Sequence, residues 1–131
     1  LNNLNCAIDN GLRIRASFMV GLPYDTDETI DLYFSQAALL PIQEFAVYPL
    51  IPYPGTGIAQ NASKLHYKIL NTDYESYMQM GKNKSAAYCL SYDNPHTGNK
   101  FGPDEVYSWK NRAEELLEKT MIHMRFSNVA N

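Results

Sequence analysis

The sequence has little cysteine, no basic run and no long apolar run, and each shortage excludes a class of protein. Two cysteines, at positions 6 and 89 of 131, give neither a disulfide framework nor a closely spaced set of metal ligands. A formal charge of -3 argues against a protein built to bind nucleic acid or an anionic membrane. No apolar stretch reaches the roughly 18 residues that a membrane-spanning helix needs. We therefore expect a cytoplasmic protein with no nucleic-acid and no membrane partner.

The sequence also lacks an initiator methionine and the basic and apolar regions of a secretory leader. Its apolar content of 45% is enough for one hydrophobic core and leaves no surplus for a second. We therefore expect one domain, or part of one, cut from a longer protein.

Apolar spacing near the start of the chain predicts a helix followed by a strand. Residues 1–10 have helical spacing and end at Gly11, which suits a helix stop. Residues 12–20 then alternate with a period of two and become apolar on both faces toward their end. A strand buried on both faces is typical of parallel sheets that are covered by helices.

A second helix and a second strand are predicted next. Asp25 or Thr26 can cap a helix with an acidic first turn, and Glu28 would complete a capping box with Asp25. This helix is expected to stop before Pro41. Residues 45–51 are nearly all apolar and are typical of a buried strand. The order helix, strand, helix, strand favours an α/β fold with parallel pairing.

The rest of the chain predicts a turn and a mainly helical extension. Pro54-Gly55 suits the centre of a type II turn. Residues 58–103 are expected to form short helices, one near 72–82, joined by irregular chain. Pro103 then begins an amphipathic helix. Its apolar side carries Val106, Trp109, Ala113, Leu116, Leu117 and Met124. The expected division is therefore 1–57 as an α/β unit and 58–131 as a helical extension that packs on it.

Two loops fall where parallel α/β proteins bind ligands, at the carboxyl ends of the strands. They are Gly21-Leu22-Pro23 and Leu50-Ile51-Pro52. A glycine there lets the backbone approach a ligand, and the following helix start offers unpaired amides. The same spacing fits a tight strand-to-helix turn that binds nothing. Both interpretations stay open on spacing alone.

The strings "ASFMVGLPYDTDETI", residues 16–30, and "YPLIPYPGT", residues 48–56, resemble the second half of the barrel of radical S-adenosylmethionine enzymes. The resemblance is to the group that often carries an upstream cobalamin-binding domain, and it covers residues 1–57. Ser17, Met19 and Gly21 stand at the Gly, Ile and Gly of that family's Gly-x-Ile-x-Gly-x-x-Glu pattern. Asp25 stands one position after its Glu, and residues 52–56 match its Pro-Tyr-Pro-Gly-Thr string.

The resemblance implies strands five and six of a partial (β/α)6 TIM-like barrel. It implies that this part of the enzyme holds the adenosine end of S-adenosylmethionine through shape and backbone contacts and helps to shape the substrate cavity. One wall of the pocket would consist of Met19, Val20, Gly21 and Leu22, and the other of Leu50, Ile51 and Pro52. None of these is an acid, a base or a nucleophile, so no catalytic residue is identified.

The family's Cys-x-x-x-Cys-x-x-Cys loop, which holds a four-iron four-sulfur cluster, is missing. Two cysteines 83 positions apart, from 89 minus 6, do not replace it. The resemblance therefore implies an absent N-terminal half as partner and a fragment that is inactive alone. It leaves open the substrate, small molecule or peptide, the reaction and the use of cobalamin. The rival interpretation is a non-catalytic α/β module, either a degenerate relative or a docking domain.

The remaining candidate residues have plainer interpretations. His66, His96 and His123 have no second ligand at helical spacing and are expected to be surface or packing residues, so no metal site is predicted. Cys6 and Cys89 are expected to be buried thiols. The tyrosines between 67 and 92 are expected to form the apolar bulk of a small core, with hydroxyls at its surface.

Overall fold

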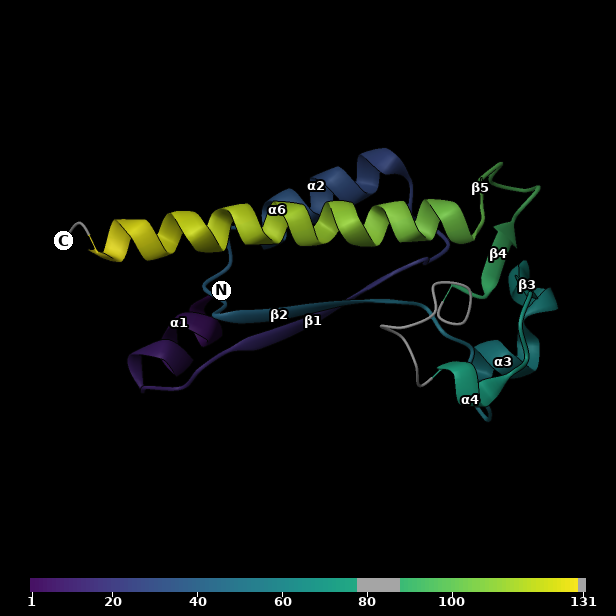
Figure 1. Cartoon of the computed structure of the whole chain (residues 1–131), viewed down its shortest axis with the longest axis horizontal. Coiled ribbons are helices and arrows are strands. Elements are labelled where there is room, and N and C mark those ends of the chain that lie inside the picture. Colours follow the sequence, from purple (N-terminus) through teal and green to yellow (C-terminus); the bar gives the residue numbers. More distant parts are fainter. Residues whose placement is uncertain (78–87, 130–131) are drawn as a thin grey trace.

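The computed structural model describes residues 1–77 and 88–129, which form a mixed α/β structure with two small sheets. Helix α1 (Asn2–Asp9), strand β1 (Arg15–Val20), helix α2 (Asp27–Ala37) and strand β2 (Glu44–Pro49) follow one another as expected. Figure 1 shows β1 and β2 running side by side beneath the long helix α6 (Pro103–Val129). The described strands do not close into a barrel. No described helix combines the length and apolarity needed to cross a membrane.

Strands β1 and β2 pair in parallel, which confirms the predicted pairing. Their register runs from Arg15 opposite Glu44 to Val20 opposite Pro49. A two-stranded sheet has only marginal stability in water without further packing. Its stability here therefore depends on the helices that cover it.

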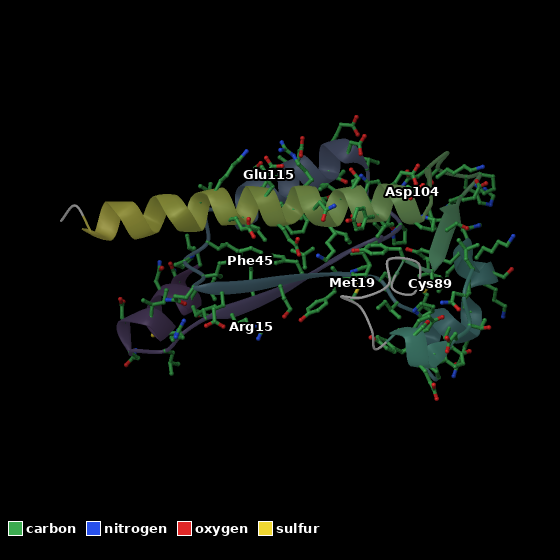
Figure 2. All side chains as sticks on the ribbon, viewed as in Figure 1. Arg15, Met19, Phe45, Cys89, Asp104 and Glu115 are labelled. Carbon is green, nitrogen blue, oxygen red and sulfur yellow. The ribbon has the colours of Figure 1, made fainter. Side chains whose placement is uncertain are left out.

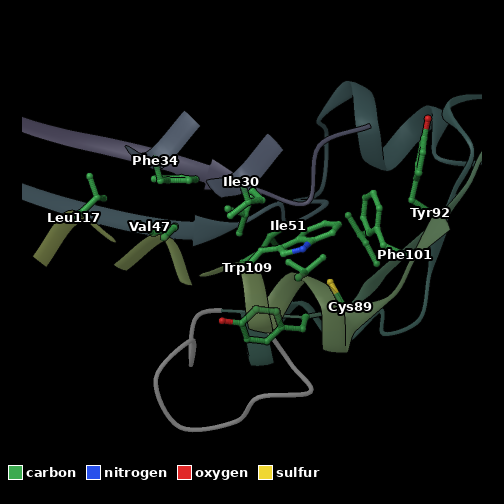
Figure 3. Close-up of a cluster of buried hydrophobic side chains, with 14 of the residues drawn as sticks. Ile30, Phe34, Val47, Ile51, Cys89, Tyr92, Phe101, Trp109 and Leu117 are labelled. Carbon is green, nitrogen blue, oxygen red and sulfur yellow. The ribbon is translucent and has the colours of Figure 1, made fainter. Parts of the chain in front are cut away.

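Both α2 and α6 cover the same face of this sheet. Phe18 of β1 meets Phe34 of α2 edge to face, with ring centroids 5.4 Å apart. Figure 3 shows Val47 of β2 beside Leu117 of α6 in the buried cluster. Between the helices, the Arg112 guanidinium contacts Asp31 at 2.7 Å. Apolar side chains from one strand face and two helix faces thus form one core.

The opposite face of the sheet is open in the described structure. In β1 every second residue is exposed, namely Arg15, Ser17 and Met19. Arg15 and Phe45 point to opposite sides of the sheet, with Phe45 toward α6 (Figure 2). The expectation that β1 is buried on both faces at its end was therefore wrong, because both covering helices lie on one side and Met19 keeps 48% of its surface exposed.

The N-cap of α2 is Thr26, which is one of the two predicted residues. Its hydroxyl accepts from the Thr29 amide at 3.2 Å, while the Thr29 hydroxyl accepts from the Thr26 amide at 2.8 Å. This reciprocal pair is a capping box. The expected box between Asp25 and Glu28 does not form, because the Asp25 carboxylate turns back to the preceding loop.

The segment 58–103 holds a sheet that the sequence did not predict. Strands β3 (Tyr67–Ile69), β4 (Leu90–Asp93) and β5 (Lys100–Phe101) form an antiparallel sheet in the order β3-β4-β5. The expected short helices are α3 (Gly57–Asn61), a 3-10 turn (Ser63–Leu65) and α4 (Tyr74–Tyr77). The part of the expected helix beyond residue 77 lies outside the described residues. This sheet lies beyond the carboxyl ends of β1 and β2 (Figure 1).

Helix α6 begins at Pro103, as predicted, because a proline at the first helical position loses no hydrogen bond. Val106, Trp109, Ala113 and Leu117 are buried, and Leu116 is half-buried. The side chain of Met124 lies outside the described part of the helix.

Two expectations about buried side chains have different outcomes. Cys89 is buried, as expected, but Cys6 is exposed, because none of the residues of α1 is buried. Four of the tyrosines between 67 and 92 belong to the core, as expected, namely Tyr67, Tyr77, Tyr88 and Tyr92. The expectation that their hydroxyls reach the surface was wrong for Tyr67, whose hydroxyl makes a buried hydrogen bond to the Gly21 carbonyl. Burial raises the pKa of the Tyr88 hydroxyl to about 12, so it stays neutral across the physiological range.

Candidate functional site

The candidate site is the pair of loops at the carboxyl ends of β1 and β2. In the first loop the Asp25 carboxylate accepts hydrogen bonds from the Gly21 amide at 2.7 Å and from the Leu22 amide at 2.9 Å. Asp25 is only 4% exposed. Burial raises the pKa of this carboxyl, while the two amide hydrogen bonds act in the opposite direction. The carboxylate closes the turn and engages the backbone amides of Gly21 and Leu22, the first two residues of the loop.

Gly21 is required by backbone conformation. Its φ of +95° lies in the left-handed region, which side chains other than hydrogen disfavour. A Cβ built there would lie 3.4 Å from Val106 and 3.6 Å from Leu50, which are ordinary contacts. Conformation rather than lack of space therefore selects glycine at this position.

Residues far along the chain fix the same loop from outside. The Tyr67 hydroxyl donates to the Gly21 carbonyl at 2.8 Å in a buried hydrogen bond. The side-chain amide of Asn99 donates to the backbone carbonyls of Pro23 at 2.9 Å and Asp25 at 3.1 Å. Burial raises the pKa of Tyr67 well above its usual value, with Tyr92 and Asp25 adding to the shift, so the hydroxyl keeps its proton and remains a donor. The amide and carbonyl of Gly21 are thus both engaged within the protein.

The helix that follows the loop is held in the same way. The indole nitrogen of Trp109 donates to the Asp27 carboxylate at 2.7 Å, which joins α6 to the first turn of α2. Sequence reasoning missed Tyr67, Asn99 and Trp109 as residues of the site. Nothing in their local sequence marks them, because their partners are 46 to 82 positions away.

The second loop continues the sheet for one residue and then turns. The Leu50 amide donates to the Val20 carbonyl at 2.8 Å, so the two loops leave the sheet together. The Thr56 amide donates to the Tyr53 carbonyl at 3.2 Å, and the φ of Gly55 is +84°. These are the features of a type II turn centred on Pro54-Gly55, which confirms the predicted turn.

The seven predicted site residues do not all face solvent. Val20, Gly21, Ile51 and Pro52 are buried, and Leu50 is half-buried. Met19 is 48% exposed and Leu22 is 38% exposed. Gly21 and Leu50 come together between the loops. Met19 and Leu22 are therefore the side chains that a ligand could contact most fully.

The space between the loops is filled. A cavity of about 10 Å³ is lined by Gly21, Leu50, Cys89 and Val106, with further apolar neighbours. That volume is at the lower limit for one water molecule. A ligand at these strand ends therefore has to lie on the open side of the sheet, where Met19 is exposed, and not in the gap that the extension has filled.

The described residues form no group of three or more histidine, cysteine, aspartate or glutamate side chains that could hold a metal ion. The structure does bring His66 and His96 together, with ring centroids 5.8 Å apart, although they are 30 positions apart in the sequence. Both lie outside the candidate site. The side chain of His123 lies outside the described residues.

Comparison with known proteins gives no match to any family model, curated protein or solved structure. The chemistry of the site is therefore inferred from its own residues. Those residues offer apolar surface and a rigid backbone, and their one buried carboxylate is engaged by two amides. Such a site suits contact with an apolar group rather than proton transfer.

Proposed function

We propose that this chain is the C-terminal part of a radical S-adenosylmethionine enzyme, in which β1 and β2 are neighbouring strands of the barrel wall. The observation that carries the proposal is the parallel pairing of β1 and β2 with both covering helices on one face. In a (β/α) barrel the helices lie outside and the other strand face looks into the lumen. The open face that carries Ser17 and Met19 would be that inner face.

In this proposal the adenosine end of the cofactor lies against Met19 and Leu22, which have the largest exposed surface among the candidate residues. Tyr48 lies opposite Met19 in the register and extends the same face. Val20, Gly21, Ile51 and Pro52 are buried and would hold the wall in shape, with Leu50 between the two loops. Apolar side chains on a rigid backbone can bind an adenine ring by shape and dispersion.

The iron-sulfur cluster needs ligands from another part of the protein. Cys6 lies exposed on α1, whereas Cys89 is buried near the carboxyl ends of the strands, so the two thiols do not form a cluster loop. When bound, the cluster and S-adenosylmethionine would supply a 5'-deoxyadenosyl radical that abstracts hydrogen from a substrate. This chain would supply binding, orientation and exclusion of water.

A second candidate function is a non-catalytic docking module. It is favoured by the engaged amide and carbonyl of Gly21 and by the filled gap between the loops, which leave no free backbone groups of Gly21 for a ligand. The outer edges of β1 and β2, which pair with no other strand of the described residues, could then serve to add a strand from a partner.

The two candidates are separated by the coding sequence upstream of Leu1 and by one assay. The enzyme proposal requires a Cys-x-x-x-Cys-x-x-Cys loop roughly 100 to 150 residues before Leu1, from the usual spacing of a (β/α) barrel. The longer protein, reconstituted anaerobically with iron and sulfide and mixed with S-adenosylmethionine and a reductant, should release 5'-deoxyadenosine. Leu22→Asp should raise the KM for S-adenosylmethionine, because it places a charge at the adenine wall.

The matched control is Leu32→Asp, since Leu32 is also exposed but lies on α2, away from the proposed wall. An upstream stop codon, an unrelated upstream domain, or absence of 5'-deoxyadenosine from a fully loaded protein would support the docking module instead.

A further inference from the structure

A second concave surface lies on the small antiparallel sheet, away from the strand ends of β1 and β2. It has a volume of about 750 Å³, which is within the usual size of a small-molecule site. We call it the β3-β5 hollow. Its polar lining comprises Ser63, His66, Lys68, Ser91, Asp93 and Lys100, with Glu105 at one side.

Strand alternation separates this polar lining from the core. Tyr67, Tyr92 and Phe101 point inward and are buried. Their neighbours Lys68 and Lys100 point outward and are exposed. The register places Lys68 opposite Ser91 and Asp93 opposite Lys100, so these four side chains share the outer face of the sheet.

Some charged groups of the hollow form ion pairs with described residues and others do not. The Asp93 carboxylate contacts the Lys100 ammonium at 3.2 Å, and the Glu105 carboxylate accepts from the Gly102 amide at 2.8 Å. The side-chain ammonium group of Lys68 makes no hydrogen bond or ion pair with another described residue. The hollow therefore has one ammonium group, that of Lys68, and one carboxylate, that of Glu105, that form no ion pair with a described residue.

Hydroxyl and ring donors line the same hollow. Ser91 lies on the neighbouring strand opposite Lys68, and Ser63 reaches the hollow from the 3-10 turn. His66 lines it with its ring edge to face against Tyr92, at a centroid distance of 6.5 Å. Donors thus come from three separate elements, which suits an anion with several oxygens rather than a single chloride ion.

We propose that the β3-β5 hollow binds a small phosphate monoester that carries hydroxyl groups, such as a sugar phosphate. The phosphate lies at Lys68 between Ser63 and Ser91, because Lys68 supplies the unbalanced charge and the hydroxyls supply further donors. Asp93 and Glu105 accept hydrogen bonds from the hydroxyl groups of the remainder of the ligand. This site does not rest on the proposed radical function, since its charged and hydroxyl-bearing ligand groups, those of Ser63, Lys68, Ser91, Asp93 and Glu105, lie outside the loops at the ends of β1 and β2.

Nucleic acid is a poorer occupant on the same observations. The chain has a formal charge of -3, and the hollow itself carries two carboxylates. A phosphate backbone would be repelled by the net negative charge of the chain and by the carboxylates of the hollow. A ligand with a single phosphate can instead direct its hydroxyl groups to these carboxylates, which accept hydrogen bonds from them.

The proposal is tested on the full chain by NMR of backbone amides during titration with glucose 6-phosphate. We expect saturable shifts that are confined to residues 63–68, 91–93 and 100–105. Glucose alone and inorganic phosphate alone, at the same ionic strength, should bind more weakly. Lys68→Gln should weaken binding of glucose 6-phosphate about tenfold or more, since one hydrogen bond to a charged group is lost.

The matched control is Lys119→Gln, which removes the same charge from an exposed position on α6. It should leave the affinity unchanged. Lys68 is exposed, so its variant should keep the amide spectrum of the rest of the chain. Shifts that do not saturate, shifts spread over the whole surface, equal binding of inorganic phosphate, or equal loss in the two variants would each overturn the proposal.

Discussion

Asp25 offers the sharpest test of how the loop after β1 is built. Asp25→Ala would remove the shared acceptor of the Gly21 and Leu22 amides. Leaving a buried backbone donor without a partner costs about 1–3 kcal/mol. Since Gly21 is buried and Leu22 is partly exposed, we expect the free energy of unfolding to fall by about 3 kcal/mol. In a 131-residue chain this corresponds to a Tm lower by about 10 °C.

Asp25→Asn should behave differently, because it keeps an acceptor but carries no charge. Burial raises the pKa of Asp25 in the folded protein, so the folded state favours the neutral carboxyl. The stability that this preference contributes is fully present below the unfolded pKa and is lost as the pH rises through the raised folded pKa. At pH 7 we therefore expect the Asn variant to lie within about 1 kcal/mol of the wild type.

The assay is urea unfolding of both variants from pH 3 to pH 7, with Asp9→Ala as an exposed control that should change stability by less than about 0.5 kcal/mol. As the pH rises, the wild type should lose stability relative to the Asn variant. Equal destabilisation by Asn and Ala at pH 7 would refute the argument that the neutral acceptor suffices. No destabilisation by Ala would refute the role of Asp25 in closing the turn.

Three further predictions concern the contacts around this loop. Tyr67→Phe should lower the free energy of unfolding by about 1–2 kcal/mol in denaturant titrations, because the buried Gly21 carbonyl loses its donor. The control Tyr33→Phe, at an exposed tyrosine, should leave the free energy of unfolding unchanged, and an equal loss in the two variants would contradict the prediction. Gly21→Ala should cost about 1–3 kcal/mol through its positive φ, and a thermal unfolding curve that matches the wild type would disprove this reading. Asp27→Ala should change the emission wavelength of Trp109, the one tryptophan of the chain, because the indole N–H loses its carboxylate acceptor, and an unchanged spectrum would argue against the hydrogen bond between them.

The parallel α/β unit could be predicted from the sequence because its signals are local. Alternation, an acidic first helical turn and proline or glycine stops together placed α1, β1, α2 and β2. The N-cap was narrowed to two neighbours, Asp25 and Thr26. The choice between them could not be made, because it depends on whether the Asp25 carboxylate faces the helix or the Gly21 amide.

The small antiparallel sheet could not be predicted, for a physical reason. Its strands β3, β4 and β5 have three, four and two residues, too few for a two-residue period to stand out. Pairing between β3 and β4 joins residues more than 20 positions apart. Tyrosines that looked like general core bulk prove to have particular roles, since the Tyr67 hydroxyl closes a buried hydrogen bond to the loop of the candidate site.

The two loops named from the sequence do lie side by side at adjacent strand ends, but the sequence did not show which of their residues are exposed. The sequence could not show that Asp25 and Tyr67 occupy both polar groups of Gly21. Nor could it show that the extension fills the gap beside Leu50. The first feature depends on the direction of the Asp25 side chain and on Tyr67, which lies 46 positions after Gly21. The second depends on Cys89 and Val106, which also come later in the sequence.

The most direct test of the proposed function is methyl NMR of Met19 during titration with S-adenosylmethionine, with the Met19 signal assigned by Met19→Leu. Met19 is exposed on the open face of β1, so a bound adenine should shift its methyl resonance. We predict a saturable shift of Met19 with S-adenosylmethionine and with 5'-deoxyadenosine, and none with methionine alone. An unchanged Met19 resonance at saturating concentrations of both adenosine compounds would contradict the proposal that these strand ends hold the adenosine end of the cofactor.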